Sequence, residues 1–255
     1  MREPRSFAAI GDSFTEGLYD PVPDGPPGRY RGWADRYAEL LGARTGGFRY
    51  ANLAVRGKLL REVVAEQLPT AIDLRPDLVS IAAGGNDILR PGCDPDTLAE
   101  LFDRAVARLQ SAGCAVLLFT GFDPLAFPVI RLLRGKIATY NMHLRAIADD
   151  RGCLLADLWS MRPLQDPRAW GTDRLHLSPD GHRRVALRVC EVTGVPAAED
   201  WRQPWPPAVP VGWLTGRRQD LRWARHYAAP WAGRRLRGVS SGDGMPPKRP
   251  DLAPL

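Results

Sequence analysis

Five short runs of continuous apolar residues, separated by stretches with helical periodicity, constrain this 255-residue chain more than any other feature of its sequence. A strand that is apolar at every position is typical of a sheet buried on both faces. Alternation of such strands with helices predicts parallel strands joined by crossover connections. The sequence therefore predicts an α/β fold, a doubly wound, mostly parallel five-stranded sheet with helices on both faces. The predicted strands are Ser6–Ile10, Phe48–Leu53, Asp77–Ala83, Ala115–Thr120 and Cys153–Leu158.

The remaining parts of this alternating pattern are helical. The clearest helix start is SPDG, in which Ser178 can cap a helix and Pro179 suits its first position. In a parallel sheet of this type, binding and catalytic residues collect beyond the carboxyl ends of the strands. The predicted helices are Trp33–Leu41, Leu59–Leu74, Pro95–Ala112, Lys136–Asp150 and Ser178–Val192.

The composition changes near residue 195. Residues 1–195 suit one α/β domain, whereas residues 196–255 are rich in Pro, Trp and Arg and are interpreted as an extension. From Asp200 onward there are ten Lys or Arg against four Asp or Glu, which accounts for the net charge of +6 of the chain. This part also holds five of the eight tryptophans, so we expect it to pack on the domain. Within it, residues 214–236 predict a basic helix broken at Pro230, and residues 240–255 are expected to be irregular.

The same composition excludes some protein classes. No run of eighteen apolar residues occurs, so no transmembrane helix is predicted. The short apolar run near the N-terminus is interpreted as a strand rather than a signal peptide, which favours a cytoplasmic protein. A basic extension can attract lipid or nucleic acid, but no nucleic-acid-binding motif is present and no nucleic-acid partner is expected. The sequence predicts no particular oligomeric state.

Four short polar blocks follow one another along the chain, and three of them come directly after predicted strands. GDSFTEG spans residues 11–17, NLAVRG spans 52–57 and GGND spans 84–87. The fourth block, DRLH at residues 173–176, comes just before the last predicted helix. Because the carboxyl ends of parallel strands share one edge of the sheet, we expect the blocks to meet there.

These blocks contain the side chains that nucleophilic catalysis needs. The hydroxyl of Ser13 is a poor nucleophile until a base removes its proton. The imidazole of His176 is a suitable base, because imidazole exchanges a proton near neutral pH. Asp173 lies three residues earlier and can hold the ring in the productive tautomer. Taken singly, each residue also has an ordinary interpretation, Ser13 as a helix cap and the other two as a loop pair.

Together the four blocks resemble the GDSL/SGNH hydrolase family over about residues 6–193. The resemblance implies a flavodoxin-like three-layer fold and hydrolysis of small-molecule or lipid esters through an acyl-enzyme, as in esterases and lipases. Acyl transfer and carbohydrate O-deacetylation on the same fold are the alternatives, and a binding protein that acts through its basic extension is a further one. No P-loop, GxGxxG or zinc-ligand spacing occurs, so no cofactor or metal is predicted.

The resemblance also implies roles for individual residues. Ser13, Asp173 and His176 correspond to the catalytic triad of the family. The backbone N–H groups of Ser13 and Gly57 and the side-chain amide of Asn86 correspond to its oxyanion hole, the set of donors that stabilises negative charge on the reacting oxygen.

Four further polar residues are expected to have supporting roles. Asp12 is interpreted as structural, bonding nearby backbone, whereas Arg56 and Asp87 are expected to shape the pocket. His182, in the last predicted helix, is interpreted as a surface or packing residue. A second serine motif, GxSxG at residues 238–242, lacks the strand, the helix and the downstream histidine that such a nucleophile needs, and is rejected.

The loop after the fourth predicted strand is rich in large apolar side chains. Such residues favour a substrate with an apolar acyl or aryl group, although they also suit a core. They are Phe122, Leu125, Phe127, Val129 and Ile130.

Overall fold

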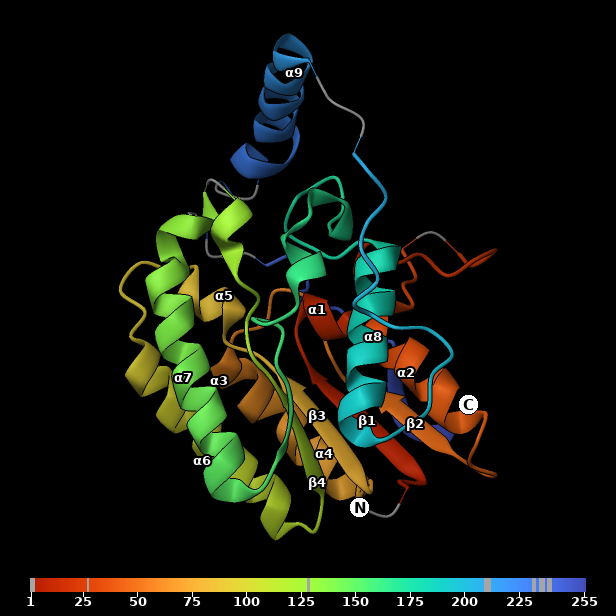
Figure 1. Cartoon of the computed structure of the whole chain (residues 1–255). Helices are drawn as coiled ribbons and strands as arrows, with labels where there is room; N and C mark the ends of the chain where they lie inside the picture. The colour runs from red at the N-terminus through yellow and green to blue at the C-terminus, as the bar shows by residue number, and fades with distance from the viewer. Residues whose placement is uncertain are drawn as a thin grey trace.

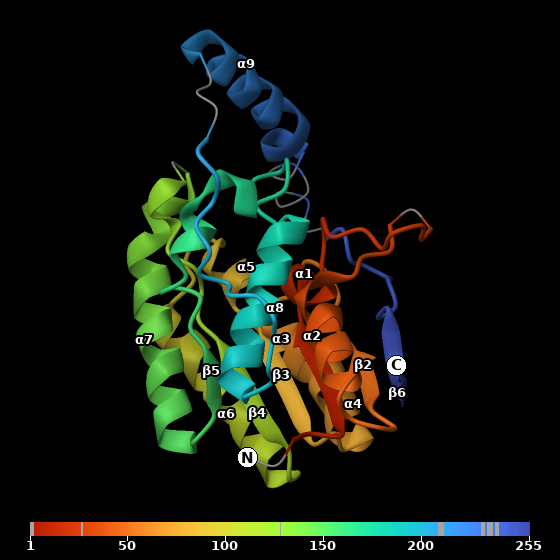
Figure 2. The same cartoon turned by 45° about the vertical axis from the view of Figure 1, so that its right-hand side comes forward.

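The computed structural model describes residues 3–26, 28–127, 129–208, 212–230, 233, 237 and 240–255. Its strands are β1 (Ser6–Gly11), β2 (Arg49–Asn52), β3 (Leu78–Ala82), β4 (Ala115–Phe119), β5 (Leu154–Ala156) and β6 (Arg249–Pro254). They form one sheet with the order β5-β4-β3-β1-β2-β6 (Figures 1 and 2). The first five strands pair in parallel, as predicted, and β6 pairs antiparallel with β2. The protein therefore has a three-layer α/β fold with a mostly parallel sheet.

Each predicted helix of residues 1–195 forms, with its ends shifted by a few residues. The predicted helix over residues 59–74 contains a wider π turn just before Pro69, which has no N–H to donate to the preceding turn. The helical segments are α1 (Ser13–Glu16), α2 (Gly32–Gly42), α3 (Leu60–Glu62), η1 (Val63–Gln67), α4 (Leu68–Leu74), α5 (Gly85–Ile88), α6 (Pro95–Ser111), η2 (Pro124–Ala126), η3 (Ile130–Leu133), α7 (Arg134–Arg151), η4 (Arg162–Gln165), η5 (Pro167–Ala169), α8 (Pro179–Thr193), α9 (Trp213–Trp223) and η6 (Ala224–Ala228).

The side chains of the sheet alternate between its two faces and build two separate cores. Phe7 and Ala9 of β1 pack in the core that includes residues of α2 and α8. Ala8 and Ile10 of the same strand pack in the opposite core, with residues of α4, α6 and α7. Burial on both faces explains why the strands are apolar at nearly every position.

The strand order places a reversal of the chain path next to β1. The chain passes from β1 to β2 on one side and then crosses to β3 on the other side. In doubly wound sheets the helices that follow the two neighbouring strands diverge at such a point and leave a crevice at the carboxyl ends. The turns after β1 and β3 carry the first and third polar blocks, so both blocks border this crevice.

The expectation that residues 240–255 are irregular is wrong. Six of these residues form β6, which extends the sheet to six strands beside β2. Two of the six are prolines, Pro250 and Pro254, which lack an N–H and are tolerated because β6 is an edge strand. Arg249 strengthens the pairing, because its Nε donates to the Tyr50 carbonyl at 2.9 Å.

The first part of the extension contacts the domain through its tryptophans. Trp201 is buried, and the indole N–H of Trp205 donates to the Pro163 carbonyl at 2.9 Å. Helix α9 and η6 then project from the end of the molecule where the strands have their carboxyl ends (Figures 1 and 2). The later part of the predicted helix, including Trp231, lies mostly outside the described residues. Among the helices described, none is both long and apolar enough to cross a membrane.

Candidate active site

Ser13, Asp173 and His176 lie together at the carboxyl end of β1, although 163 positions separate the serine from the histidine. His176 Nε2 lies 2.9 Å from Ser13 Oγ, and His176 Nδ1 lies 2.5 Å from Asp173 Oδ2. A carboxylate can only accept, so the Asp173 contact places the ring proton on Nδ1 and leaves Nε2 as an acceptor. The arrangement lets the histidine take the proton of the Ser13 hydroxyl.

The turn from β1 into α1 positions Ser13. Asp12 caps α1, with its Oδ1 accepting from the Phe14 N–H at 3.0 Å, in agreement with its predicted structural role. Gly11 lets this turn approach β3 closely, since a Cβ there would lie 2.3 Å from the Ala82 carbonyl oxygen. The serine therefore sits at the tight junction of a strand and a short helix, where its hydroxyl faces the loop that carries His176.

Backbone contacts hold the Asp173 carboxylate in place. Its Oδ1 accepts from the N–H groups of Leu175 and His176 at 3.0 and 3.1 Å. Burial opposes ionisation of Asp173, but the His176 ring and these two N–H groups outweigh it and lower the pKa of Asp173. The carboxylate is thus kept ionised and aimed at the ring.

Tyr19 is a neighbour of the histidine that the sequence did not reveal. Its ring stacks on that of His176, with centroids 5.8 Å apart and planes 9° from parallel. The ring also packs against Gly171, where a Cβ would lie 2.4 Å from it. Tyr19 therefore restricts rotation of the imidazole, a role that no motif signals because it depends on two loops meeting.

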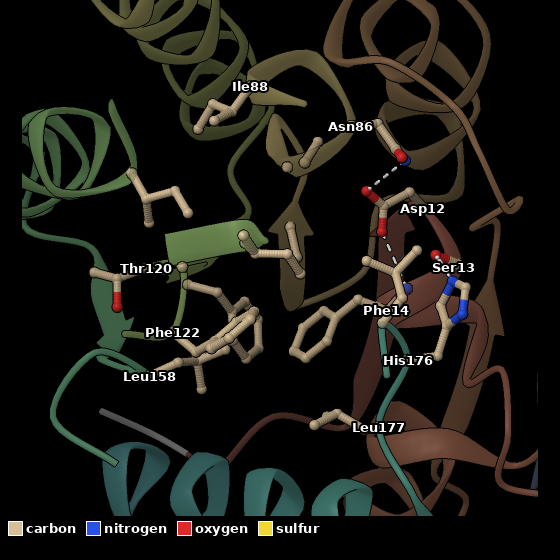
Figure 3. Close-up of a pocket in the computed structure, with 18 of the residues that line it drawn as sticks. Asp12, Ser13, Phe14, Asn86, Ile88, Thr120, Phe122, Leu158, His176 and Leu177 are labelled. Atoms are coloured by element: carbon tan, nitrogen blue, oxygen red, sulfur yellow. Dashed lines mark hydrogen bonds between the residues drawn. The ribbon is translucent and has the colours of Figure 1, made fainter. Parts of the chain in front are cut away.

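Asn86 lies in α5, directly after β3, and faces the Asp12 side of the serine turn (Figure 3). Its Nδ2 donates to Asp12 Oδ2 at 3.1 Å and to the Lys58 carbonyl at 3.2 Å. Burial raises the pKa of Asp12 to about 6, although the Phe14 N–H and His176 favour its ionised form. Asp12 therefore connects the serine turn to Asn86, a contact beyond the local backbone role predicted for it.

Gly57 lies in the loop after β2 with a φ of 75°, a left-handed conformation that suits glycine. The neighbouring Arg56 is tied to α1, because its N–H donates to Glu16 Oε2 at 2.7 Å and its Nε donates to Glu16 Oε1 at 2.9 Å. Arg56 is not among the residues that line the pocket beside Ser13, contrary to the expectation that it shapes this pocket. Its side chain instead joins the Gly57 loop to α1, the helix that begins with Ser13.

Asp87 and His182 also serve the framework. Asp87 Oδ2 accepts from the Leu60 N–H at 3.0 Å and does not line the pocket, so the expectation for this residue is corrected too. His182 is a packing residue, buried in α8, with Nδ1 accepting from the Trp33 N–H and Nε2 donating to the Leu18 carbonyl. Burial lowers the pKa of His182 to about 4.

A cavity of about 210 Å³ opens beside Ser13 and His176 (Figure 3). Apart from the polar residues already described, its walls are mostly apolar and come from the ends of β3 and β4, from α7 and from the loops around them. Phe122 and Ile130 contribute to the wall as predicted, whereas Leu125 and Val129 are exposed and Phe127 is part of the core. Its apolar lining residues include Ile88, Phe119, Phe122, Ile137, Leu158 and Trp170. Within the described residues, no cluster of His, Cys, Asp and Glu has the form of a metal site.

Comparison with known proteins identifies the family of the chain. The sequence model of the GDSL-like Lipase/Acylhydrolase family matches residues 9–184, more than half of the chain. No curated protein matches the chain.

Solved structures share the fold. LAE5, an alpha/beta hydrolase enzyme from the metagenome of Lake Arreo in Spain, is 26% identical with a TM-score of 0.63, covering 75% of this chain and 95% of its own. The acetylxylan esterase Axe2 from Geobacillus stearothermophilus is 21% identical with a TM-score of 0.57, covering 78% and 96%. TesA is 22% identical with a TM-score of 0.60, covering 73% and 97%. From the extent of the family match, we conclude that this chain belongs to the GDSL-like lipase/acylhydrolase family and is a hydrolase that cleaves ester bonds.

Proposed function

We propose that the protein is a serine esterase that hydrolyses carboxylic esters through an acyl-enzyme on Ser13. The observation that carries the proposal is the continuous hydrogen-bonded chain from Asp173 through His176 to Ser13. Ser13 Oγ attacks the ester carbonyl while His176 Nε2 takes the hydroxyl proton. His176 then gives that proton to the departing alkoxide, so that an alcohol leaves and the acyl group stays on Ser13. A water molecule repeats the sequence, and its attack releases the acid and restores the hydroxyl.

The tetrahedral intermediate carries a negative oxygen that needs donors in place before the reaction. We assign this role to the backbone N–H groups of Ser13 and Gly57 and to the Asn86 amide. In the resting protein Asn86 donates to Asp12 and to the Lys58 carbonyl, so the oxyanion must compete with these acceptors for the amide. The negative charge of the intermediate favours it over the neutral Lys58 carbonyl, because hydrogen bonds to charged acceptors are the stronger ones.

The pocket favours an apolar acyl group over an acetyl group. Its walls beyond Ser13 are formed by side chains such as Phe122, Leu158 and Trp170, which gain most by contact with a hydrocarbon or aryl substituent. Structural neighbours include acetylxylan esterases, whose names indicate substrates that carry a small acetyl group. A series of p-nitrophenyl esters from acetate to decanoate distinguishes the two classes. We expect kcat/KM to rise with chain length, and a maximum at acetate would refute the apolar preference.

The direct test of the mechanism is Ser13→Ala, with Ser160→Ala as the control at an exposed serine. Ser13→Ala should lower kcat by about 10³-fold or more and abolish labelling by a fluorophosphonate, with unchanged thermal unfolding. Ser160→Ala should match the wild type. If Ser13→Ala keeps more than a tenth of the activity, the nucleophile lies elsewhere.

The oxyanion assignment has a separate test. Asn86→Ala should lower kcat by about 10²- to 10³-fold and change KM little, the usual consequence of removing one such donor. An unchanged kcat would mean that Asn86 only holds Asp12 and the Lys58 loop.

A further inference from the structure

The final sixteen residues, Ser240–Leu255, here called the C-terminal arm, lie against the Gly57 loop and the end of α1, the helix that begins with Ser13. We propose that the turn Ser240–Asp243, anchored by Lys248 and β6, positions the Gly57 loop, so that the C-terminal arm sets the geometry of the oxyanion hole. The inference rests on the proposed function, because it concerns the Gly57 N–H as an oxyanion donor. The arm lies beyond the family match, which ends at residue 184.

The turn is packed directly on the Gly57 loop. Ser240 Oγ lies 3.5 Å from the Arg56 carbonyl oxygen and accepts from the Gly242 N–H at 3.2 Å. A Cβ at Gly57 would lie 2.0 Å from Ser240 Oγ, and a Cβ at Gly242 would lie 2.0 Å from the Arg56 carbonyl oxygen. A methyl group added to either Gly57 or Gly242 would therefore collide with the opposite segment. A displacement of the turn toward the loop is therefore transmitted to the Arg56–Gly57 peptide, which bears the proposed donor.

Lys248 connects the same arm to the nucleophile helix. Its Nζ donates to the carbonyls of Glu16, Tyr30 and Arg31 at 2.6, 3.0 and 2.7 Å, and it forms an ion pair with Asp35. Glu16 is the last residue of α1, the helix that begins with Ser13. Lys248 thus holds the end of α1. It follows the turn that contacts Gly57 by only a few residues along the chain.

Two further links complete the connection. The Glu16 carboxylate accepts from the Arg56 N–H, which ties the helix to the Gly57 loop from inside. The pairing of β6 with β2 fixes the arm beside the strand from which that loop emerges. Contacts on both sides therefore fix the distance between Ser13 and the Gly57 N–H. Preorganised stabilisation of an oxyanion requires such a fixed distance.

The test compares two alanine substitutions in one short segment. Gly242→Ala places a methyl group against the Arg56 carbonyl, whereas Gly244→Ala has nothing within 4 Å of its Cβ but adopts a φ of 72°. Both substitutions should lower the unfolding temperature by a few degrees, Gly244→Ala through backbone strain alone. Gly242→Ala should also lower kcat and the rate of Ser13 phosphonylation by about tenfold or more, with KM within a factor of about three. Gly244→Ala should keep kcat within a factor of about two.

The two outcomes separate positioning from simple stabilisation. If both variants are folded and have the same kcat, the arm is only a structural cover and the inference is wrong. If Gly242→Ala does not fold, Ser240→Ala decides, because it removes the hydroxyl above Gly57 and adds no atom. It should lower kcat by about two- to fivefold relative to Ser160→Ala, and an unchanged kcat would overturn the inference. A wild-type protein without Ser13-dependent esterase activity would refute the proposed function itself, and the positioning role with it.

Discussion

The extension of this protein contacts the candidate active site through two segments that are attached in opposite ways. The C-terminal arm is embedded, with a strand that pairs with β2 across one register shift and a Lys248 side chain that is only 14% exposed. The segment of α9 and η6, residues 213–228 and here called the α9 arm, rests on the surface. Its Trp213 and Leu221 side chains are both 72% exposed. One segment lies on the Gly57 side of Ser13 and the other on the Asp173 side.

The described contacts of the α9 arm are few, and most of them involve solvent-exposed groups. The indole N–H of Trp223 donates to the Asp173 carbonyl at 2.7 Å, and the Tyr227 and Thr172 hydroxyls are 2.9 Å apart. Asp220 pairs with Arg174 on the surface. The α9 arm is also the more basic of the two, with four arginines against Asp220, whereas the C-terminal arm has two basic and two acidic residues. This difference shows that burial of the partner groups, rather than composition, decides how much an attachment contributes to stability.

The largest effect is expected from Lys248→Met, which leaves the Asp35 carboxylate buried without its cation. Breaking a buried pair in this way costs about 3–5 kcal/mol of unfolding free energy, measurable by urea denaturation. Arg44→Met removes one partner of an exposed pair with Glu3 and should cost about 0–1 kcal/mol. Similar losses for the two variants would show that the C-terminal arm is no better anchored than a surface contact.

The next effect is the loss of stability at low pH, which we expect from the buried His182 of the framework. His182 has a folded-state pKa of about 4, below the value of about 6.5 for an unfolded chain. The unfolded state therefore binds the extra proton first, and stability is lost as pH falls from 6.5 towards 4.

This loss can amount to about 3 kcal/mol. The stability difference between the wild type and His182→Gln should shrink by up to that amount between pH 7 and pH 4. His226→Gln, at an exposed site in the α9 arm, serves as the matched control for the loss of a histidine. A constant difference for His182→Gln would contradict the buried, neutral state of this ring.

A smaller effect is expected from Trp223→Phe, which keeps an aromatic ring but removes the N–H that bonds the Asp173 carbonyl. The loss of one partly buried hydrogen bond is about 1 kcal/mol, so limited proteolysis within the α9 arm should become several-fold faster. Esterase kcat should change by less than about threefold, since the Asp173 carboxylate keeps its own contacts. A tenfold loss of kcat would place the α9 arm among the segments that set catalytic geometry.

The smallest effect is expected from Asp220→Asn. This change breaks the exposed pair with Arg174, for which we expect a loss of no more than about 0.5 kcal/mol. The measurement is the unfolding free energy at low and high salt, which should be nearly equal for variant and wild type. A clear loss that disappears in high salt would mean that surface charge attaches the α9 arm after all.

The sequence by itself determined the five parallel strands and the segments that meet at their carboxyl ends. Runs such as Ala115–Thr120 are apolar throughout, and a doubly buried strand is the state that this pattern favours most. The position of Ser13 after the first strand followed from the same pattern. Local signals of this kind depend on neighbouring residues, so they can be recognised without knowledge of the rest of the chain.

Tertiary structure alone decided which distant groups became partners. Residues 249–254, with two prolines, have no strand pattern of their own, and they pair because the edge of β2 is available. Lys248 finds three carbonyls and Asp35, and Tyr19 finds His176, only after separate loops have been brought together. Such contacts gain their energy from burial and from the meeting of distant segments, and neither quantity is encoded in the residues next to them.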